Sequence, residues 1–361
     1  MPHVTLPPCS SPDAPDPRRA TGRPLRWGIV STGHIARVVS AQLAQLEDAR
    51  LHAVSSRSAE SAAAFARDLG VAHAYHDADG VSGLERLASD PEVDVAYVAT
   101  PHAQHRDAVR TLLEAGKHVL VEKAFTVTAE QARELAGLAA ERERFLMEAL
   151  WTRFLPSYRI VSERIAAGAI GRPIWIHADL GMPLAFDPDS RMWASEAAGG
   201  ALLDLAVYPL AWSVAACGLP TALHATGSLA PNGVDELAAL TLQHADGAHA
   251  QVVVSLSATH SRSLRIAGSD GLVLVGAPMP NPAHVTLEQG RRTLRWRSDA
   301  SVPPYCYELR EVTRCVQEGL RESPTMPLRD SVALMELLDR ARRAIDVRYG
   351  DEVERVARAP S

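Results

Sequence analysis

The chain has 361 residues, of which 47% are hydrophobic and 22% charged, so it can form two domains with apolar cores. Its formal net charge of -6 argues against nucleic acid as the main partner, because phosphate binding favours a basic surface. The four cysteines show no CxxC spacing, which argues against a zinc site or a disulfide framework and favours a reducing compartment. We find no apolar run approaching the roughly 20 residues of a membrane helix. We therefore expect a cytoplasmic protein with no membrane partner.

Residues 1–24 are rich in proline and poor in apolar side chains, which predicts a disordered tail. The pair Arg18-Arg19 is reminiscent of a twin-arginine export signal, but no apolar signal segment follows it. The next residues, "LRWGIV", are better explained as the first strand of a core. We therefore place the start of the folded chain at Leu25.

From residue 25 to residue 150, short apolar runs alternate with stretches whose apolar residues have helical spacing. The expected strands are residues 25–30, 51–56, 93–100, 117–123 and 145–150. The expected helices between them are residues 34–46, 58–70, 104–116 and 128–144. Thr128 and Gln131 have the spacing of a capping box at the start of the last helix. Such alternation with short links predicts an α/β fold with a doubly wound parallel sheet, the Rossmann architecture.

After Trp151 the pattern changes to one helix followed by a half-exposed strand and three hairpins. Asp-Gly pairs at the turns of two of these hairpins are a strong hairpin signal. In chain order the expected elements are a helix at 157–168, a strand at 172–180, hairpins at 236–258, 263–276 and 284–296, and helices at 307–320 and 330–345. We predict a second, α+β domain over residues 151–350, with a large and mostly antiparallel open sheet, and a short tail over residues 351–361.

The segment "GIVSTGHIA" follows the first expected strand, where a dinucleotide fold carries its glycine loop G-x-G-x-x-G/A. Gly33 keeps the position where the phosphate approaches the backbone, whereas Ser31 replaces the glycine of the tight turn. Ser31 fits that position only if its dihedral angles stay in a region open to L-residues. A plain strand-to-helix turn is the alternative, but the place after the first strand favours a cofactor site. The expected cofactor residues are Ser31, Thr32, Gly33, His34 and Ile35.

The end of the second strand, "AVSSRS", predicts which dinucleotide is bound. An NAD site usually has an acidic residue here for the ribose 2′-hydroxyl, whereas an arginine accommodates the 2′-phosphate of NADP. Ser56 is uncharged and Arg57 offers a fork of donors suited to phosphate. A solvated surface arginine is the alternative for Arg57. We predict NADP, with NAD possible.

Two further strands end in polar residues that would line the same crevice, since ligands bind at the carboxyl ends of strands in such sheets. "TPHAQH" supplies Thr100, Pro101 and His105, and "VEKAF" supplies Glu122 and Lys123. A metal site at His102 and His105 would lack a third ligand, so no metal is expected. Lys123 has plain surface charge as its alternative, but the apolar strand before it leads into the crevice.

The segment "AAGGALLDLAVYPLAW" holds Asp204 and Tyr208 at i and i+4 of an expected helix, on one face. Pro209 cannot donate to the carbonyl of Leu205, so the helix must kink or restart there. From these residues alone, two interpretations remain. Asp204 and Tyr208 could form a catalytic pair, or Tyr208 could be a buried core residue whose hydroxyl is hydrogen-bonded to Asp204.

Six segments together carry a family resemblance: "RWGIVSTGHIA", "VAYVATPHAQH", "GKHVLVEK", "FLMEALWTRFLP", "GGALLDLAVYPL" and "ESPTMPL". With these the chain resembles the Gfo/Idh/MocA family of NAD(P)-dependent oxidoreductases. Within that family it is most similar to the branch of dimeric dihydrodiol dehydrogenases and D-xylose dehydrogenases. The resemblance runs from about Leu25 to Gly350. It implies a Rossmann domain followed by a domain whose open sheet forms a homodimer interface.

The resemblance also implies roles for matching residues. Lys123 would lie beside the nicotinamide, Tyr208 would be the general acid/base, and Asp204 would lie near the substrate. The substrate pocket would be walled by Trp151, Arg153 and Phe154. The family proline after the lysine is Ala124 here, which makes a cis peptide bond at this point doubtful, because non-proline cis bonds cost about 3 kcal/mol.

Together these features predict hydride transfer between C4 of a nicotinamide and a secondary alcohol carbon of a small polyol, sugar or cyclic dihydrodiol. Tyr208 would take or supply the hydroxyl proton, assisted by the positive charge of Lys123. The alternative is a catalytically silent dinucleotide-binding sensor or regulator. The presence of both Lys123 and Tyr208 argues against it.

Overall fold

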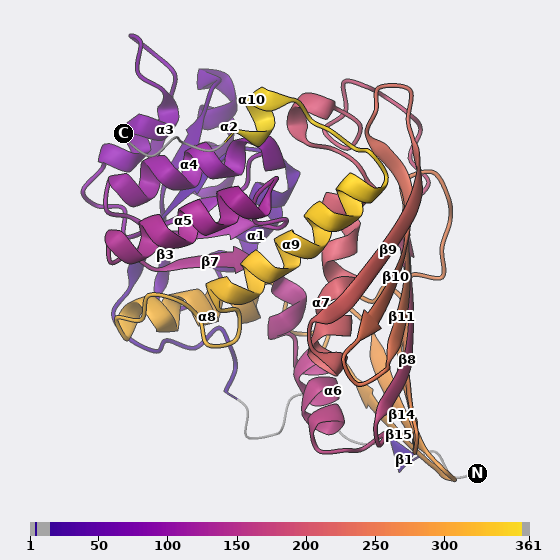
Figure 1. The fold of residues 1–361 in the computed structure, drawn as a ribbon. Coiled ribbons are helices and arrows are strands. Elements are labelled where there is room, and N and C mark those ends of the chain that lie inside the picture. Colours follow the sequence, from indigo (N-terminus) through magenta and orange to yellow (C-terminus); the bar gives the residue numbers. More distant parts are fainter. Residues whose placement is uncertain (1–3, 6–14, 356–361) are drawn as a thin grey trace. The chain divides into compact units, whose positions relative to one another are not determined.

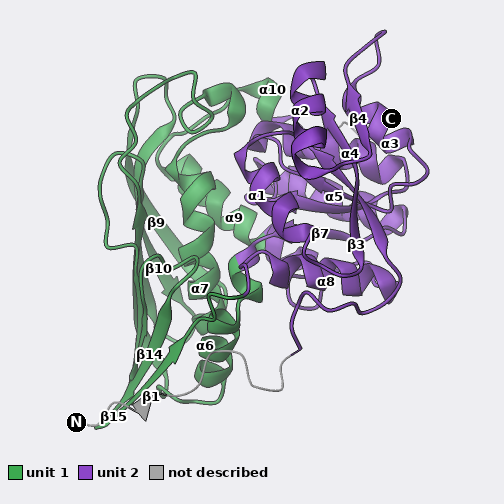
Figure 2. Cartoon of the chain, turned by 180° about the vertical axis from the view of Figure 1, so that it is seen from behind, with its two compact units in different colours: residues 1–14, 152–301, 333–353 green, residues 15–151, 302–332, 354–361 purple. Residues whose placement is uncertain are grey.

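A computed structural model describes residues 4–5 and 15–355 of the chain. These residues divide into two units, coloured separately in Figure 2. The Rossmann unit comprises residues 15–151, 302–332 and 354–355. The sheet unit comprises residues 4–5, 152–301 and 333–353. Each unit is therefore assembled from separate stretches of the chain.

The Rossmann unit is built on a six-stranded sheet in which every neighbouring pair is parallel. In spatial order its strands are β4 (His73–His76), β3 (Ala49–Ser56), β2 (Leu25–Val30), β5 (Val95–Val98), β6 (His118–Glu122) and β7 (Leu146–Ala149). Its first five helices are α1 (His34–Leu43), α2 (Ala59–Leu69), α3 (Gly83–Ser89), α4 (His102–Glu114) and α5 (Ala129–Glu141). The strand order reverses between β2 and β5, which is the point where such sheets bind ligands. The predicted doubly wound parallel sheet is confirmed.

Local sequence signals explain where several of these helices begin and end. Thr128 and Gln131 form the expected capping box of α5, and Gly70 ends α2 with a left-handed φ of 68°. Strand β4 and helix α3 were not predicted from the sequence. Strand β4 has only four residues, none fully buried, so it lacks apolar alternation. A capping box at Ser82 and Glu85 was the available signal for α3.

Helix α8 (Cys306–Gln317) belongs to the Rossmann unit, whereas the sequence analysis placed it in the second domain. Arg310 on α8 holds Asp48, which precedes β3, with Nη2 2.5 Å from Oδ1 and Nη1 2.9 Å from Oδ2. The Asp48 side chain is only 1% exposed, and its guanidinium partner keeps its pKa well below the usual range although burial opposes this. A pair this distant in sequence leaves no local pattern. The expected second domain, residues 151–350, therefore wrongly included α8.

The expected tail is bound to the Rossmann unit over its described part, residues 15–24. The backbone N–H of Thr21 donates to Asp48 Oδ2 at 2.8 Å, and Arg310 Nε donates to the carbonyl of Pro17 at 2.8 Å. Of the rest of residues 1–24, only β1 (Val4–Thr5) is described, and it pairs with β15 in the sheet unit. In the second expected tail, α10 (Asp351–Glu354) is helical and residues 356–361 lie outside the described part.

The sheet unit contains a nine-stranded, mostly antiparallel sheet, as predicted. In spatial order its strands are β1, β15 (Arg292–Arg297), β14 (His284–Gln289), β13 (Leu272–Val275), β12 (Leu264–Gly268), β8 (Pro173–Gly181), β11 (His249–Ser255), β10 (Asp235–His244) and β9 (Pro220–Leu229). The three predicted hairpins are β10–β11, β12–β13 and β14–β15. Strand β9 was not predicted, and the pairs β8–β11 and β1–β15 are parallel.

Helices α6 (Pro156–Ala166), α7 (Val207–Cys217) and α9 (Leu328–Ala344, in this unit from residue 333) lie along one face of the sheet (Figure 1). On β8 the side chains of Ile176, Ala178 and Leu180 are buried on that face. Trp175, on the opposite face, is 37% exposed. Neither view shows a helix over that opposite face among the described residues (Figures 1 and 2).

One helical run in the described residues, Ser195–Cys217, is long and apolar enough to cross a membrane by length and composition. This corrects the expectation that no run approaches that length. Most of its apolar window is buried inside the protein, as in the core helix of a folded domain. The run includes α7 and the segment that carries Asp204.

Candidate active site

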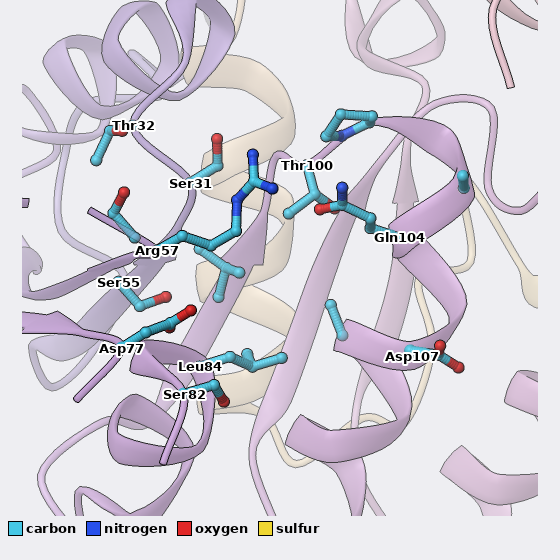
Figure 3. Close-up of a pocket in the computed structure, with 15 residues that line it drawn as sticks. Ser31, Thr32, Ser55, Arg57, Asp77, Ser82, Leu84, Thr100, Gln104 and Asp107 are labelled. Carbon is cyan, nitrogen blue, oxygen red and sulfur yellow. The ribbon is translucent and has the colours of Figure 1, made fainter. Parts of the chain in front are cut away.

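A cavity of about 450 Å³ opens in the Rossmann unit at the carboxyl ends of β2, β3 and β5 (Figure 3). It is lined by several of the residues predicted to bind the cofactor, namely Ser31, Thr32, Ser56, Arg57, Thr100 and Pro101. Residues that the sequence analysis did not predict complete the lining: Val30, Ser55, Asp77, Ser82, Leu84, Ala103, Gln104, Asp107 and Ala108. Asp77, Ser82 and Leu84 lie near the start of α3, which was not predicted, whereas Ala103, Gln104, Asp107 and Ala108 lie on α4, which was.

Ser31 adopts a φ of 107°, a conformation that favours glycine. Ser31 was expected to fit this turn only with dihedral angles open to L-residues. Its φ lies outside that region, so the expected condition is not met. The turn keeps the geometry of the missing glycine, and hydrogen bonds hold the serine in it. Its N–H donates to the carbonyl of Ser55 at 3.0 Å, and its Oγ accepts from the N–H of Gly33 at 3.2 Å.

Gly33 leaves open the space that a pyrophosphate needs. Its φ of -68° and ψ of 178° are accessible to any residue. A Cβ placed there would meet only Ser31 Oγ, at 3.4 Å. Helix α1, which starts at His34 with Ile35 behind it, has no side-chain cap and no acidic residue in its first turn. Its free N–H groups therefore suit an anion, and the loop fits a dinucleotide.

Arg57 extends over the cavity from the end of β3 (Figure 3). No acidic side chain accompanies it there, since Ser55 and Ser56 precede it. The lining contains two carboxylates, and both have partners. Asp77 Oδ1 accepts from the N–H of Gly83, at the start of α3, at 2.7 Å, and Asp107 Oδ1 accepts from Arg106 Nη1 at 2.6 Å. Arg57 is exposed and can swing toward a bound group.

Glu122 and Lys123 end β6 beside a buried polar group. The hydroxyl of Tyr97 donates to Glu122 Oε1 at 2.5 Å, and burial with the Glu122 charge raises the Tyr97 pKa well above its usual value. Burial and the same charge also raise the pKa of Glu308, on α8, well above its usual range. Tyr97 and Glu308 therefore favour their protonated forms beside Glu122, and Lys123, partly exposed, follows Glu122 directly.

A cis peptide bond after Lys123 was considered doubtful because Ala124 replaces the family proline. The bond between Lys123 and Ala124 is cis, which corrects that expectation. Two histidines of α4 hold the surrounding backbone. His102 Nε2 lies 3.2 Å from the carbonyl of Lys123, and His105 Nδ1 lies 3.0 Å from that of Ala124. His105 Nε2 also lies 2.9 Å from the carbonyl of Thr100. Burial and the neighbouring His102 lower the pKa of His105 to about 3, so the ring is neutral and donates to only one of these two carbonyls.

Asp204 and Tyr208 lie in the sheet unit, where a π-helical turn (Leu202–Ala206) leads directly into α7. A kink or restart was expected at Pro209. The backbone instead stays helical and changes from π to α at Val207, which places Pro209 in the first turn of α7. π-turns are frequent at functional sites. Asp204 and Tyr208 are 6% and 7% exposed, and Arg191 Nη1 lies 3.5 Å from Asp204 Oδ1.

The residues expected to wall the substrate pocket form the 3₁₀ turn Trp151–Phe154. The division between the units falls inside this turn. Trp151 belongs to the Rossmann unit, where its ring centroid lies 4.9 Å from that of Tyr305. Arg153 and Phe154 belong to the sheet unit and are half-buried.

One trio of side chains elsewhere in the Rossmann unit could approach a metal ion, namely His52, His73 and Glu92, whose ligand atoms lie within 4.8 Å of one another. Two of the three already have protein partners. His52 Nε2 lies 3.0 Å from Asp90 Oδ2, and Arg26 Nη1 lies 2.8 Å from Glu92 Oε1. A metal ion would have to compete with both contacts.

Two family models match the chain. "Oxidoreductase family, NAD-binding Rossmann fold" matches residues 25–150, and "GFO/IDH/MocA C-terminal domain" matches residues 158–274. Among curated relatives, the trans-1,2-dihydrobenzene-1,2-diol dehydrogenase of Bos taurus is 33% identical over 342 residues, covering 90% of this chain and 98% of the relative. The Homo sapiens enzyme of the same name is 33% identical over 338 residues, with the same coverage.

Solved structures of the same fold include an aldose-aldose oxidoreductase from Caulobacter crescentus complexed with glycerol. It has a TM-score of 0.80 and 23% identity, over 90% of this chain and 98% of the other. A 3-ketoreductase from Actinomadura kijaniata, in complex with NADP and TDP-benzene, has a TM-score of 0.79 and 25% identity over the same shares. With both family models and these relatives matched, the chain belongs to the Gfo/Idh/MocA family of NAD(P)-dependent oxidoreductases.

Proposed function

We propose that this dehydrogenase uses NADP and transfers hydride between C4 of the nicotinamide and a secondary alcohol carbon of a small polyol, sugar or cyclic dihydrodiol. The observation that carries the cofactor choice is Arg57, which extends over the cavity from a strand end with no acidic side chain. The substrate class is supported by the names of the relatives, which are dihydrodiol and sugar oxidoreductases.

When bound, NADP supplies the hydride acceptor or donor of the reaction. The Gly33 backbone and the first turn of α1 would hold the pyrophosphate, and Arg57 with Ser56 the 2′-phosphate. Tyr208 would take the hydroxyl proton of the alcohol, or return it in reduction. A free tyrosine has a pKa near 10, so the positive charge of Lys123 would be needed to favour the phenolate. Asp204 would orient a substrate hydroxyl by accepting its hydrogen bond.

A fluorescence titration with NADPH and NADH tests the cofactor, and we expect tighter binding of NADPH. NADP reduction measured over D-xylose, D-glucose, inositol and a trans-dihydrodiol tests the substrate class. Turnover of at least one of these compounds is expected, with a much lower rate when NAD replaces NADP. Equal rates with both dinucleotides would refute the role of Arg57.

A catalytically silent dinucleotide sensor is the second candidate. Tight NADPH binding without turnover of any compound in the screen would favour it. The presence of Lys123 at the end of β6 and of Tyr208 at the start of α7 supports the enzyme instead.

We also propose a cytoplasmic homodimer formed through the open face of the sheet. Trp175 on β8 is 37% exposed, and its ring stacks on that of His177 with a centroid distance of 5.6 Å. An exposed aromatic side chain on an uncovered sheet face favours an interaction surface. The described cysteines are all free thiols, which supports a reducing compartment.

A further inference from the structure

The turn at Gly199 and Gly200 opens the helical segment that carries Asp204 and Tyr208, and its geometry demands both glycines. Gly200 has a φ of 113°, which favours glycine. A Cβ on Gly199 would come within 2.6 Å of the carbonyl oxygen of Met192, and one on Gly200 would collide with Asp235 Oδ1. The turn is thus enclosed by the protein on both sides.

Asp235 holds the turn from the sheet. It is the first residue of β10 and is fully buried. Its Oδ2 accepts from the N–H of Leu202 at 2.6 Å, at the first residue of the π-helical turn. Its Oδ1 is buried without a hydrogen-bond partner among the described residues. The N–H of Leu202 is one of the donors that the start of a helix leaves unpaired, so this hydrogen bond to Asp235 fixes the start of the segment.

Tyr349 holds the same turn from the chain segment after α9. Its hydroxyl donates to the carbonyl of Gly199 at 2.8 Å, and the side chain is buried. The guanidinium of Arg342, on α9, lies 5.4 Å from the centroid of the Tyr349 ring. Arg342 in turn pairs with Asp339 at 3.3 Å, one turn earlier on α9. The ring is therefore itself held in place by a buried ion pair.

We propose that Asp235 and Tyr349 are positioning residues that clamp the Gly199–Gly200 turn and thereby fix Asp204 and Tyr208. This inference rests on the proposed function of Tyr208. Tyr349 lies beyond residues 158–274, which the C-terminal family model matches, so the clamp extends the active-site machinery into the last part of the chain. Tyr349 holds the carbonyl of Gly199 and Asp235 holds the N–H of Leu202. These two contacts leave the segment little freedom to shift.

The Tyr349→Phe variant removes the hydroxyl and keeps the ring. We expect kcat to fall by about tenfold, because small displacements of catalytic groups are costly. The KM for NADP should stay unchanged, since the cofactor cavity lies in the Rossmann unit. Hydrogen exchange at residues 199–208 should become faster in the unliganded variant. Asp235→Asn, which keeps an oxygen for the Leu202 N–H, should retain more activity than Asp235→Ala.

Tyr158→Phe is the matched control. The Tyr158 hydroxyl also donates from a buried ring to a backbone carbonyl of the same helical segment, that of Ala211 at 3.2 Å, but beyond Tyr208. It should lower the melting temperature by a similar amount without lowering kcat.

An unchanged kcat in Tyr349→Phe, or an equal loss in Tyr158→Phe, would overturn the proposal, as would unchanged exchange at residues 199–208. If the wild-type protein turns over none of the screened compounds, the proposed function fails and the catalytic part of this inference falls with it. The exchange measurement still reports on the clamp, so the two failures are distinguishable.

Discussion

Asp235→Asn tests the energetic consequence of placing a carboxyl group at the buried start of a helix. Burial raises the pKa of Asp235 to about 7 from an ordinary value of 3.8, although the backbone N–H groups around it favour the charged form. Between these two pH values the folded protein keeps a proton that the unfolded chain has lost. The free energy of unfolding contributed by Asp235 therefore decreases as the pH rises through this window. At 1.36 kcal/mol per pKa unit, the full decrease is about 4 kcal/mol.

Asparagine cannot ionise, so the comparison isolates this one group. Urea unfolding of wild type and Asp235→Asn, followed by circular dichroism from pH 4 to pH 8, gives the measurement. We expect the wild type to lose stability relative to the variant by about 4 kcal/mol over that range, most of it below pH 7. A stability difference that stays flat with pH would refute the reasoning, because it would mean that Asp235 ionises equally in both states.

Asp179→Asn provides a control of opposite sign in the same unit. Burial raises the pKa of Asp179, but hydrogen bonds from Ser261 and Ser263 outweigh it, so the pKa lies below its usual value. The wild type should then lose stability relative to Asp179→Asn as the pH falls below about 4. Opposite trends in the two variants would exclude a general effect of replacing a carboxylate by an amide.

Four further predictions concern the cofactor, the chemistry, the fold and the assembly. Arg57→Ala should weaken NADPH binding by about tenfold to a hundredfold in a fluorescence titration, through the loss of charge-assisted hydrogen bonds, and an equal loss for NADH would contradict it. Tyr208→Phe should lower kcat by about a hundredfold or more with unchanged NADPH affinity, and intact turnover would exclude it as the acid/base. Arg310→Ala should lower the free energy of unfolding by about 3–5 kcal/mol, since it leaves the Asp48 carboxylate buried without its partner, and a loss under 1 kcal/mol in thermal unfolding would speak against this. Trp175→Asp should reduce the mass measured by light scattering from dimer to monomer, and a monomeric wild type would refute the proposed interface.

The sequence was sufficient to predict both sheets because their signals are local. Apolar periods marked most strands and helices of the Rossmann unit, and the Asp-Gly turns marked two hairpins of the second sheet. The features that could not be predicted depend on contacts between residues far apart in the sequence. Helix α8 packs in the Rossmann unit because Arg310 meets Asp48, a pairing that no short window contains.

The candidate site shows the same limit. The cavity residues that were predicted directly follow the ends of strands. Whether Asp77 and Gln104 also line the cavity depends on how α3 and α4 pack, and no local pattern reports that. The left-handed Ser31 and the cis bond at Ala124 were misjudged because residue type was taken as the constraint. In the folded protein, Ser31 is held by the carbonyl of Ser55, which accepts from it, and by the N–H of Gly33, which donates to it, and His105 lies against the carbonyl of Ala124.

The division of the chain has a consequence for modularity. The Rossmann unit takes its sheet from residues 25–149 and α8 from residues 306–317, and the sheet unit occupies the stretch between them. A fragment ending near residue 150 would contain every strand of the parallel sheet. It would lack α8, so it would expose the apolar surface that α8 covers and leave the Asp48 carboxylate without Arg310. The sheet unit also includes residues 4–5 and 333–353, so the two units alternate along the chain and neither can be cut out and transplanted as a single stretch of sequence. A chimaera that exchanges the Rossmann unit of this chain would therefore have to exchange residues 15–151 and 302–332 together.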